Sequence, residues 1–275
     1  MKLFAKVIGL YYNLLSVFNL NAATHKAFIL FCSPRKGAIT DEQRQFLDTS
    51  EKHVLFFEEI PITAYIWKGH KTTILFAHGW ESNAGRWEPY ILKLKDIGHT
   101  IIAIDAPKHG NSGGALFDLP LYVEFLNVAC KEFQPEVLVG HSMGATSIAY
   151  LHYKYPVRSL KKMVLLAPPA YLSRIMADYQ KLLGYNNNIM ASLEDLCEEK
   201  FGMRFDEFSI PKYAKAFEEL KSLIIHDRFD DITPFAEGKA IASNLKGSKF
   251  IATEGLGHSL PSEKVYSEVF DFIAS

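Results

Sequence analysis

Short apolar runs of strand length alternate with segments of helix length from residue 53 to the C-terminus. The run at 72–77 (Thr-Thr-Ile-Leu-Phe-Ala) carries no charge, which is typical of a strand buried on both faces. The other strand-like runs lie at 53–58, 62–67, 100–104, 136–140, 162–166, 222–225 and 249–252. Strands that alternate with helices predict an α/β fold with a mostly parallel central sheet flanked by helices.

Residues 169–219 interrupt this alternation, because they contain no strand-like run. A connection between adjacent parallel strands needs far fewer residues. We therefore expect two or three inserted helices that act as a lid. The predicted organisation is an N-terminal helical extension (1–52), a core (53–168 and 220–275) and a helical lid (169–219).

The segment Gly140-His141-Ser142-Met143-Gly144 matches the pattern G-x-S-x-G. It follows an apolar strand and opens a helix, the context in which this pattern places a nucleophilic serine on a tight turn. The two glycines allow the neighbouring backbone to approach where side chains would clash. Ser142 is the predicted nucleophile.

A serine hydroxyl is a weak nucleophile and needs a base, which in turn needs an orienting acid. In this strand–turn–helix architecture the three residues follow in the order Ser, Asp, His. His258, in Gly255-Leu256-Gly257-His258 near the C-terminus, is the predicted base. Asp230 is the preferred acid, because it lies at the right distance past the strand at 222–225 for the chain to turn back toward His258. Asp227 and Asp231, close to it in the chain, stay open as alternatives.

Acyl transfer also needs hydrogen-bond donors for the oxyanion that forms on the substrate. One predicted donor is the backbone N–H of Met143, the residue after the serine. The other is the backbone N–H of Trp80, because the loop after the strand at 72–77 opens with His78-Gly79-Trp80. Gly79 permits a close backbone approach at this position.

These segments together resemble the α/β-hydrolase family over roughly residues 53–275. The segments that carry the resemblance are His78-Gly79-Trp80, residues 105–112 (Asp-Ala-Pro-Lys-His-Gly-Asn-Ser), Gly140 to Gly144, Asp230 with Pro234, and Gly257-His258. Lys108 stands where the family pattern has a glycine. The resemblance implies an eight-stranded sheet with a lid after the sixth strand, where residues 169–219 fall. It also implies that the central reaction needs no metal and no organic cofactor.

A serine at the nucleophile position disfavours the family's dehalogenases and epoxide hydrolases, which use an aspartate there. The expected function is a serine hydrolase that cleaves a carboxylic ester or thioester of a small-molecule acyl substrate through an acyl-enzyme. An acyltransferase and a carbon–carbon bond hydrolase with the same triad stay open as alternatives. A non-catalytic ligand-binding protein is disfavoured by the complete Ser, Asp and His set.

Composition excludes several other classes. Thirty basic and 31 acidic residues give a net charge of −1, which argues against a dedicated nucleic-acid binder. Three cysteines without a CxxC spacing argue against a disulfide framework or a zinc site. A reducing compartment, the cytoplasm, is the expected location.

The N-terminus differs from the rest of the chain in charge. Residues 1–40 contain Lys2, Lys6, Lys26, Arg35 and Lys36 and no acid, so the remaining residues carry a net −6. Residues 2–20 are dense in apolar side chains with one narrow polar stripe, which predicts a helix that buries most of its circumference. A helix packed on its own domain, peripheral membrane contact through residues 1–20, and a cleaved or anchoring signal remain open.

Overall fold

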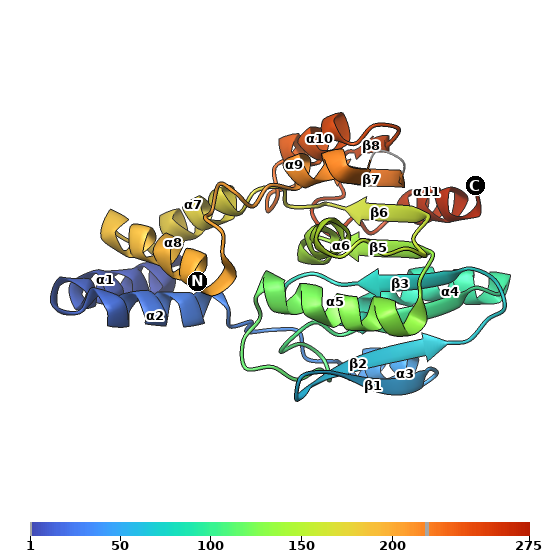
Figure 1. Ribbon diagram of the computed structural model, residues 1–275, viewed down its shortest axis with the longest axis horizontal. Helices are drawn as coiled ribbons and strands as arrows, with labels where there is room; N and C mark the ends of the chain where they lie inside the picture. The colour runs from blue at the N-terminus through green and yellow to red at the C-terminus, as the bar shows by residue number, and fades with distance from the viewer. Residues whose placement is uncertain (1, 218–219) are drawn as a thin grey trace. The chain divides into compact units, whose positions relative to one another are not determined.

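A computed structural model describes residues 2–217 and 220–275, and it contains one sheet of eight strands (Figure 1). The strands are β1 (Glu51–Phe57), β2 (Ile60–Trp67), β3 (Thr73–Ala77), β4 (Thr100–Ile104), β5 (Val137–His141), β6 (Lys162–Leu166), β7 (Lys221–Asp227) and β8 (Lys249–Thr253). Each predicted strand is present, with bounds shifted by no more than two residues.

The strand order is β1-β2-β4-β3-β5-β6-β7-β8. The two pairings of β2, with β1 and with β4, are antiparallel, and every other pairing is parallel. The prediction of a mostly parallel sheet is therefore confirmed. The carboxyl ends of β3, β5 and β7 lie at one edge, so the loops after these strands converge there.

Helices cover both faces of the sheet. On one face, α3 (Asp41–Leu47), α4 (Glu88–Ile97) and α11 (Glu263–Ala274) enclose a core that includes Trp87, Tyr90 and Phe270. The opposite face carries α5 (Leu119–Phe133) and α6 (Met143–Lys154), which lie in front of the strands in Figure 1. Four further short elements accompany the sheet: η1 (Ala84–Trp87), α9 (Ile210–Ala214), η2 (Lys215–Phe217) and α10 (Phe235–Asn244).

The chain divides into two compact units. One contains Pro34–Ala170 and Ile210–Ser275, with the whole sheet. The other contains Met1–Ser33 and Tyr171–Ser209, with helices α1 (Lys2–Phe18), α2 (Leu20–Phe31), α7 (Leu172–Leu183) and α8 (Asn187–Phe201). We call the second the helical unit. It combines residues 1–33 of the predicted extension with residues 171–209 of the predicted lid.

Residues 34–52, predicted as part of the extension, belong to the unit that contains the sheet. Thr40 and Gln43 form a reciprocal capping box that starts α3, and Phe46 and Leu47 on this helix enter the core. A lid role for 169–219 stays a prediction, and residues 218–219 of that segment lie outside the described residues.

The prediction that the helix at residues 2–20 buries most of its circumference was wrong. The polar stripe faces the protein: Gly9 is buried, and Asn13 donates from Nδ2 to the carbonyl of Gly184 at 2.8 Å. The apolar side is exposed, with Phe4 68% and Leu10 61% accessible. Small and polar side chains can form a packing stripe when the partner offers free carbonyls, so polarity alone did not identify the solvent face.

Candidate active site

Ser142 occupies the turn between β5 and α6. Its backbone has φ 54° and ψ −126°, a conformation that a residue with a Cβ adopts only when the surroundings hold it there. Gly144 explains part of this constraint, since a Cβ at that position would lie 2.1 Å from the carbonyl oxygen of Ala77 on β3. The glycine lets the start of α6 pack directly against the neighbouring strand, and the turn presents the Ser142 hydroxyl.

The structure brings the three predicted triad residues together. Ser142 Oγ lies 2.9 Å from Nε2 of His258, and Nδ1 of His258 lies 2.8 Å from Oδ2 of Asp230. An ionised carboxylate can only accept, so Nδ1 carries the hydrogen and the Nε2 lone pair faces the serine hydroxyl. This is the geometry in which a histidine removes a proton from a serine.

The side chain of Asp230 is fully buried, yet the surroundings favour its ionised form. Burial by itself raises the pKa of this carboxyl, but hydrogen bonds from His226, His258 and the Thr233 amide outweigh it and hold the pKa well below 3.8. The amides of Ile232 and Thr233 donate to Oδ1 at 2.9 and 2.8 Å. Asp230 therefore offers a fixed negative charge to His258.

The two alternative acids occupy other places. Asp227 accepts from the Phe229 amide, the Thr253 hydroxyl and the Leu256 amide at 2.8–2.9 Å, so it holds together the loops that carry Asp230 and His258. These bonds lower its pKa against the opposing effect of burial. Asp231 is exposed. Of the three aspartates, Asp230 is the one that contacts His258.

His78 orients the peptide that carries the predicted Trp80 donor. The Ala106 amide donates to Nε2 of His78 at 2.9 Å, so the hydrogen is on Nδ1, which donates to the carbonyl of Gly79 at 2.7 Å. In a trans peptide the C=O and N–H point in opposite directions, so the Trp80 N–H points away from His78. Gly79 lies against the nucleophile, since a Cβ there would come 2.9 Å from the Ser142 Cβ.

Met143, the other predicted donor, lies at the start of helix α6. It is the first residue of α6, and first-turn N–H groups have no partner within their own helix. The helix dipole adds to the positive potential at this point. The loop after β3, through Gly79, and the start of α6 thus both lie beside Ser142, and the amides of Trp80 and Met143 stay the predicted oxyanion donors.

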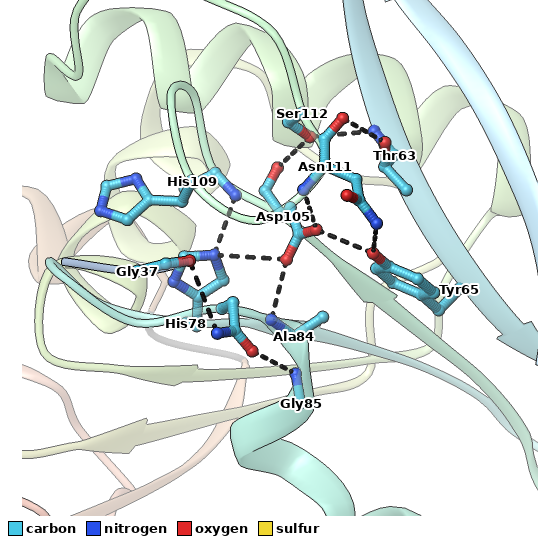
Figure 2. A network of polar contacts seen from close by, with 12 residues as sticks. Gly37, Thr63, Tyr65, His78, Ala84, Gly85, Asp105, His109, Asn111 and Ser112 are labelled. Carbon is cyan, nitrogen blue, oxygen red and sulfur yellow. Dashed lines mark hydrogen bonds and ion pairs between the residues drawn. The ribbon is translucent and has the colours of Figure 1, made fainter. Parts of the chain in front are cut away.

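The segment at 105–112 forms a buried network around Asp105 (Figure 2). The Asp105 carboxylate accepts from the Ala84 amide at 2.8 Å, the Asn111 amide at 2.8 Å and the Tyr65 hydroxyl at 3.0 Å. Burial raises its pKa to about 6, while the same hydrogen bonds act to lower it. Because Ala106 donates to His78, this network also fixes the residue that orients the Trp80 peptide.

Residues 74–270 match the model of the alpha/beta hydrolase family, which is well over half of the chain. The chain belongs to the α/β-hydrolase family. The resemblance noted in the sequence is therefore confirmed.

Individual relatives of this hydrolase have low sequence identity to it but match it over most of their length. The bifunctional esterase/perhydrolase DCH of Acinetobacter calcoaceticus is 25% identical over 259 residues, covering 74% of this chain and 91% of that protein. The AB hydrolase superfamily protein YisY of Bacillus subtilis is 24% identical over 272 residues, covering 82% and 98%. Among solved structures, the esterase Pf2001 of Pyrococcus furiosus has a TM-score of 0.67 at 19% identity, covering 88% and 98%. At that identity the similarity shows the fold alone.

Three residues of this hydrolase's site were not singled out from the sequence. His226 Nε2 lies 2.9 Å from the Thr233 carbonyl and 3.3 Å from Asp230 Oδ2, so its hydrogen is shared between the two acceptors. Arg86 donates to Nδ1 of His141 at 2.6 Å, and Nε2 of His141 then donates to the carbonyl of His258 at 2.8 Å. The position of His141 between Gly140 and Ser142 was a signal that this residue belongs to the site, whereas nothing in the sequence indicated Arg86.

Buried neutral histidines predict acid sensitivity. Burial holds the pKa values of His78 and His141 well below 6.5, so as pH falls below 6.5 the unfolded chain takes up two protons that the folded hydrolase does not. Asp105 has the opposite effect on stability between pH 6 and 3.8. Its pKa is raised in the folded protein, so the folded state takes up this proton before the unfolded chain does. Burial also lowers the pKa values of His99, His109 and His152, so the unfolded chain takes up at least one more proton than the folded protein. We therefore expect a loss of at least about 1 kcal/mol of unfolding free energy per pH unit below pH 6. Urea unfolding at pH 7, 6 and 5 measures it, and an unchanged midpoint would contradict it.

Within residues 2–217 and 220–275, no group of three or more His, Cys, Asp or Glu side chains is placed to hold a metal ion. The buried polar groups around Ser142 instead contact one another, as the pairs His78–Ala106 and His141–Arg86 show. The chemistry that this arrangement supports is proton transfer between Ser142 and His258.

Proposed function

We propose that this protein is a serine hydrolase that cleaves a carboxylic ester or thioester of a small-molecule acyl substrate. The observation that carries the proposal is the hydrogen-bonded series Asp230–His258–Ser142, with distances of 2.8 and 2.9 Å, ending at a serine in a constrained backbone conformation. A serine with only a structural role would not require a histidine whose Nδ1 is hydrogen-bonded to a buried carboxylate. The names of the relatives, such as the esterase/perhydrolase DCH, agree with this class of reaction.

In the proposed first half-reaction, Ser142 Oγ attacks the acyl carbon while Nε2 of His258 takes the hydroxyl proton. The carbonyl π electrons move to oxygen, and the amides of Trp80 and Met143 stabilise the resulting oxyanion. Asp230 stabilises the imidazolium without taking its proton. The tetrahedral species then collapses, the bond to the leaving group breaks, and His258 returns the proton to the departing alcohol or thiol.

In the second half-reaction, water attacks the acyl-enzyme while His258 takes one of its protons. A second oxyanion forms at the same two amides, and its collapse releases the carboxylic acid as Ser142 Oγ regains a proton from His258. An acyltransferase would use the same steps with an alcohol in place of water, and a carbon–carbon bond hydrolase would expel a carbanion equivalent. We propose water as the acceptor because no acceptor other than water is needed to complete the cycle.

The proposed setting is the cytoplasm. Support comes from the cysteines, since Cys32, Cys130 and Cys197 form no disulfide in the described structure. Burial raises the pKa of Cys130 to about 12, so this thiol is an unreactive apolar side chain.

A chain-length profile tests the function. Purified protein is offered p-nitrophenyl esters and matched acyl thioesters from acetyl to dodecanoyl, with and without a competing alcohol. We expect turnover of at least one series, with free carboxylic acid as the main product. Ester products with the alcohol would identify a transferase, while absence of turnover across both series would contradict a hydrolytic function.

A further inference from the structure

Helix α1 exposes an apolar face that belongs to no core. One stripe consists of Leu3, Val7, Leu10, Leu14 and Val17, each at least 56% accessible. A second stripe at seven-residue spacing consists of Phe4, Tyr11 and Phe18, which are 68%, 53% and 88% accessible. At 100° per residue both stripes fall within an arc of about 140°. We call this surface the α1 face.

The opposite side of α1 is fixed within the helical unit, so the α1 face cannot turn inward by rotation of the helix. A Cβ at Gly9 would lie 1.8 Å from the carbonyl oxygen of Leu183, which shows how closely α1 approaches the end of α7. Asn13 donates to the Gly184 carbonyl at 2.8 Å and accepts from the Asn186 amide at 2.9 Å. Asn186 Nδ2 donates to Ser16 Oγ at 3.0 Å.

The charged residues of α1 and of the adjoining helix α2 are all positive. Helices α1 and α2 contain Lys2, Lys6 and Lys26 and no aspartate or glutamate. Four of the five acidic residues of α7 and α8 form ion pairs with arginines: Asp178 pairs with Arg174 at 2.7 Å, and Glu194, Asp195 and Glu198 pair with Arg204 at 2.9, 3.5 and 2.5 Å. An exposed apolar helix face with lysines and without acids matches the interface of a bilayer that contains anionic lipids.

We propose that the α1 face binds the surface of an anionic lipid bilayer. Helix α1 then lies flat, with its leucine and valine stripe in the upper acyl region and the Tyr11 ring at the level of the headgroups. Seventeen residues give a length of about 25 Å, and no helix among the described residues has the length and apolarity that a membrane span requires. Contact is therefore peripheral.

The 4-3-4-3 spacing of the first stripe also suits a helix of a second copy, but charge disfavours that occupant. A stable helix pair places opposite charges beside the apolar seam. Two copies of α1 would bring lysines to lysines with no acid on either helix. Two and a half heptads also form a short seam for a pair that carries like charges.

Vesicle flotation tests the proposal with the full-length protein. The double variant L10E/L14E places two carboxylates in the middle of the α1 face. The matched control is L92E, which makes the same change at a half-exposed leucine on α4, 49% accessible, in the other unit. Vesicles are either phosphatidylcholine with phosphatidylglycerol or phosphatidylcholine alone. Circular dichroism and turnover of a soluble ester confirm that each variant is folded.

We expect the wild type and L92E to float with the mixed vesicles and L10E/L14E to partition at least tenfold less. Weaker binding to phosphatidylcholine alone, and to mixed vesicles at high salt, is expected from the lysines. The proposal is overturned if the wild type does not float, if L10E/L14E floats equally well, or if phosphatidylcholine alone binds as strongly. A wild-type dimer that L10E/L14E converts to a monomer, without flotation, would assign the α1 face to a second copy instead.

Discussion

Replacement of Ser142 by alanine is expected to lower kcat/KM for ester hydrolysis by about 10⁴-fold or more. The hydroxyl that lies 2.9 Å from His258 Nε2 is the proposed site of the acyl-enzyme, and no other described hydroxyl lies at that nitrogen. Substrate binding and the two amides of Trp80 and Met143 are retained, so the loss falls on kcat rather than on KM. Hydrolysis of the best p-nitrophenyl ester measures the effect.

Ser147→Ala is the matched control for this experiment. Ser147 is a buried serine on α6, the helix that begins directly after Ser142, and its hydroxyl donates to the Met143 carbonyl at 2.7 Å. We expect kcat/KM of this variant to stay within a few-fold of the wild-type value, because the Ser147 hydroxyl bonds to a backbone carbonyl and to no reacting atom. Retention of more than a tenth of the activity by Ser142→Ala would refute its role as the nucleophile.

Asp230→Asn is expected to lower kcat by about 10⁴-fold. The carboxylate determines that Nδ1 of His258 carries the hydrogen, at 2.8 Å, and leaves the Nε2 lone pair toward Ser142. An amide can present its NH₂ group to Nδ1 instead, which reverses the tautomer and removes the base. Since the pKa of Asp230 lies well below 3.8, the wild-type carboxylate is ionised throughout the pH range in which the reaction is measured.

Two neighbouring aspartates, Asp227 at the end of β7 and Asp231 in the loop after it, serve to distinguish loss of catalysis from loss of stability. Asp231→Asn changes an exposed side chain and is expected to leave kcat within about twofold. Asp227→Asn removes an acceptor for the Thr253 hydroxyl and the Leu256 amide, so we expect a lower thermal midpoint together with reduced activity. If Asp231→Asn were as damaging as Asp230→Asn, the assignment of the acid would be wrong.

The fold and the main candidate residues followed from the sequence because they depend on local order. Alternating strands and helices predicted the sheet, and the chain order of Ser142, Asp230 and His258 selected residues that the structure brings into contact. The preference for Asp230 over its neighbours rested on its distance from the end of a strand. That distance is a local property, so one sequence was sufficient.

The supporting contacts depend on residues far apart in the chain. Arg86 reaches His141 across 55 positions, and His141 reaches the carbonyl of His258 across 117, and no periodicity indicates such a meeting. The prediction for the helix at residues 2–20 failed for another reason. Its burial depends on free carbonyls at the end of α7, such as that of Gly184, which exist only after α7 has folded.

Covalent labelling with a fluorophosphonate tests the central claim most directly, because the reagent phosphonylates a serine only when a neighbouring base has activated it. We predict one equivalent of label on the folded wild type, located on the peptide that contains Ser142, and no label on Ser142→Ala. Label on a different serine, or an unlabelled wild type that is folded by circular dichroism, would contradict the assignment of Ser142, His258 and Asp230 as a catalytic triad.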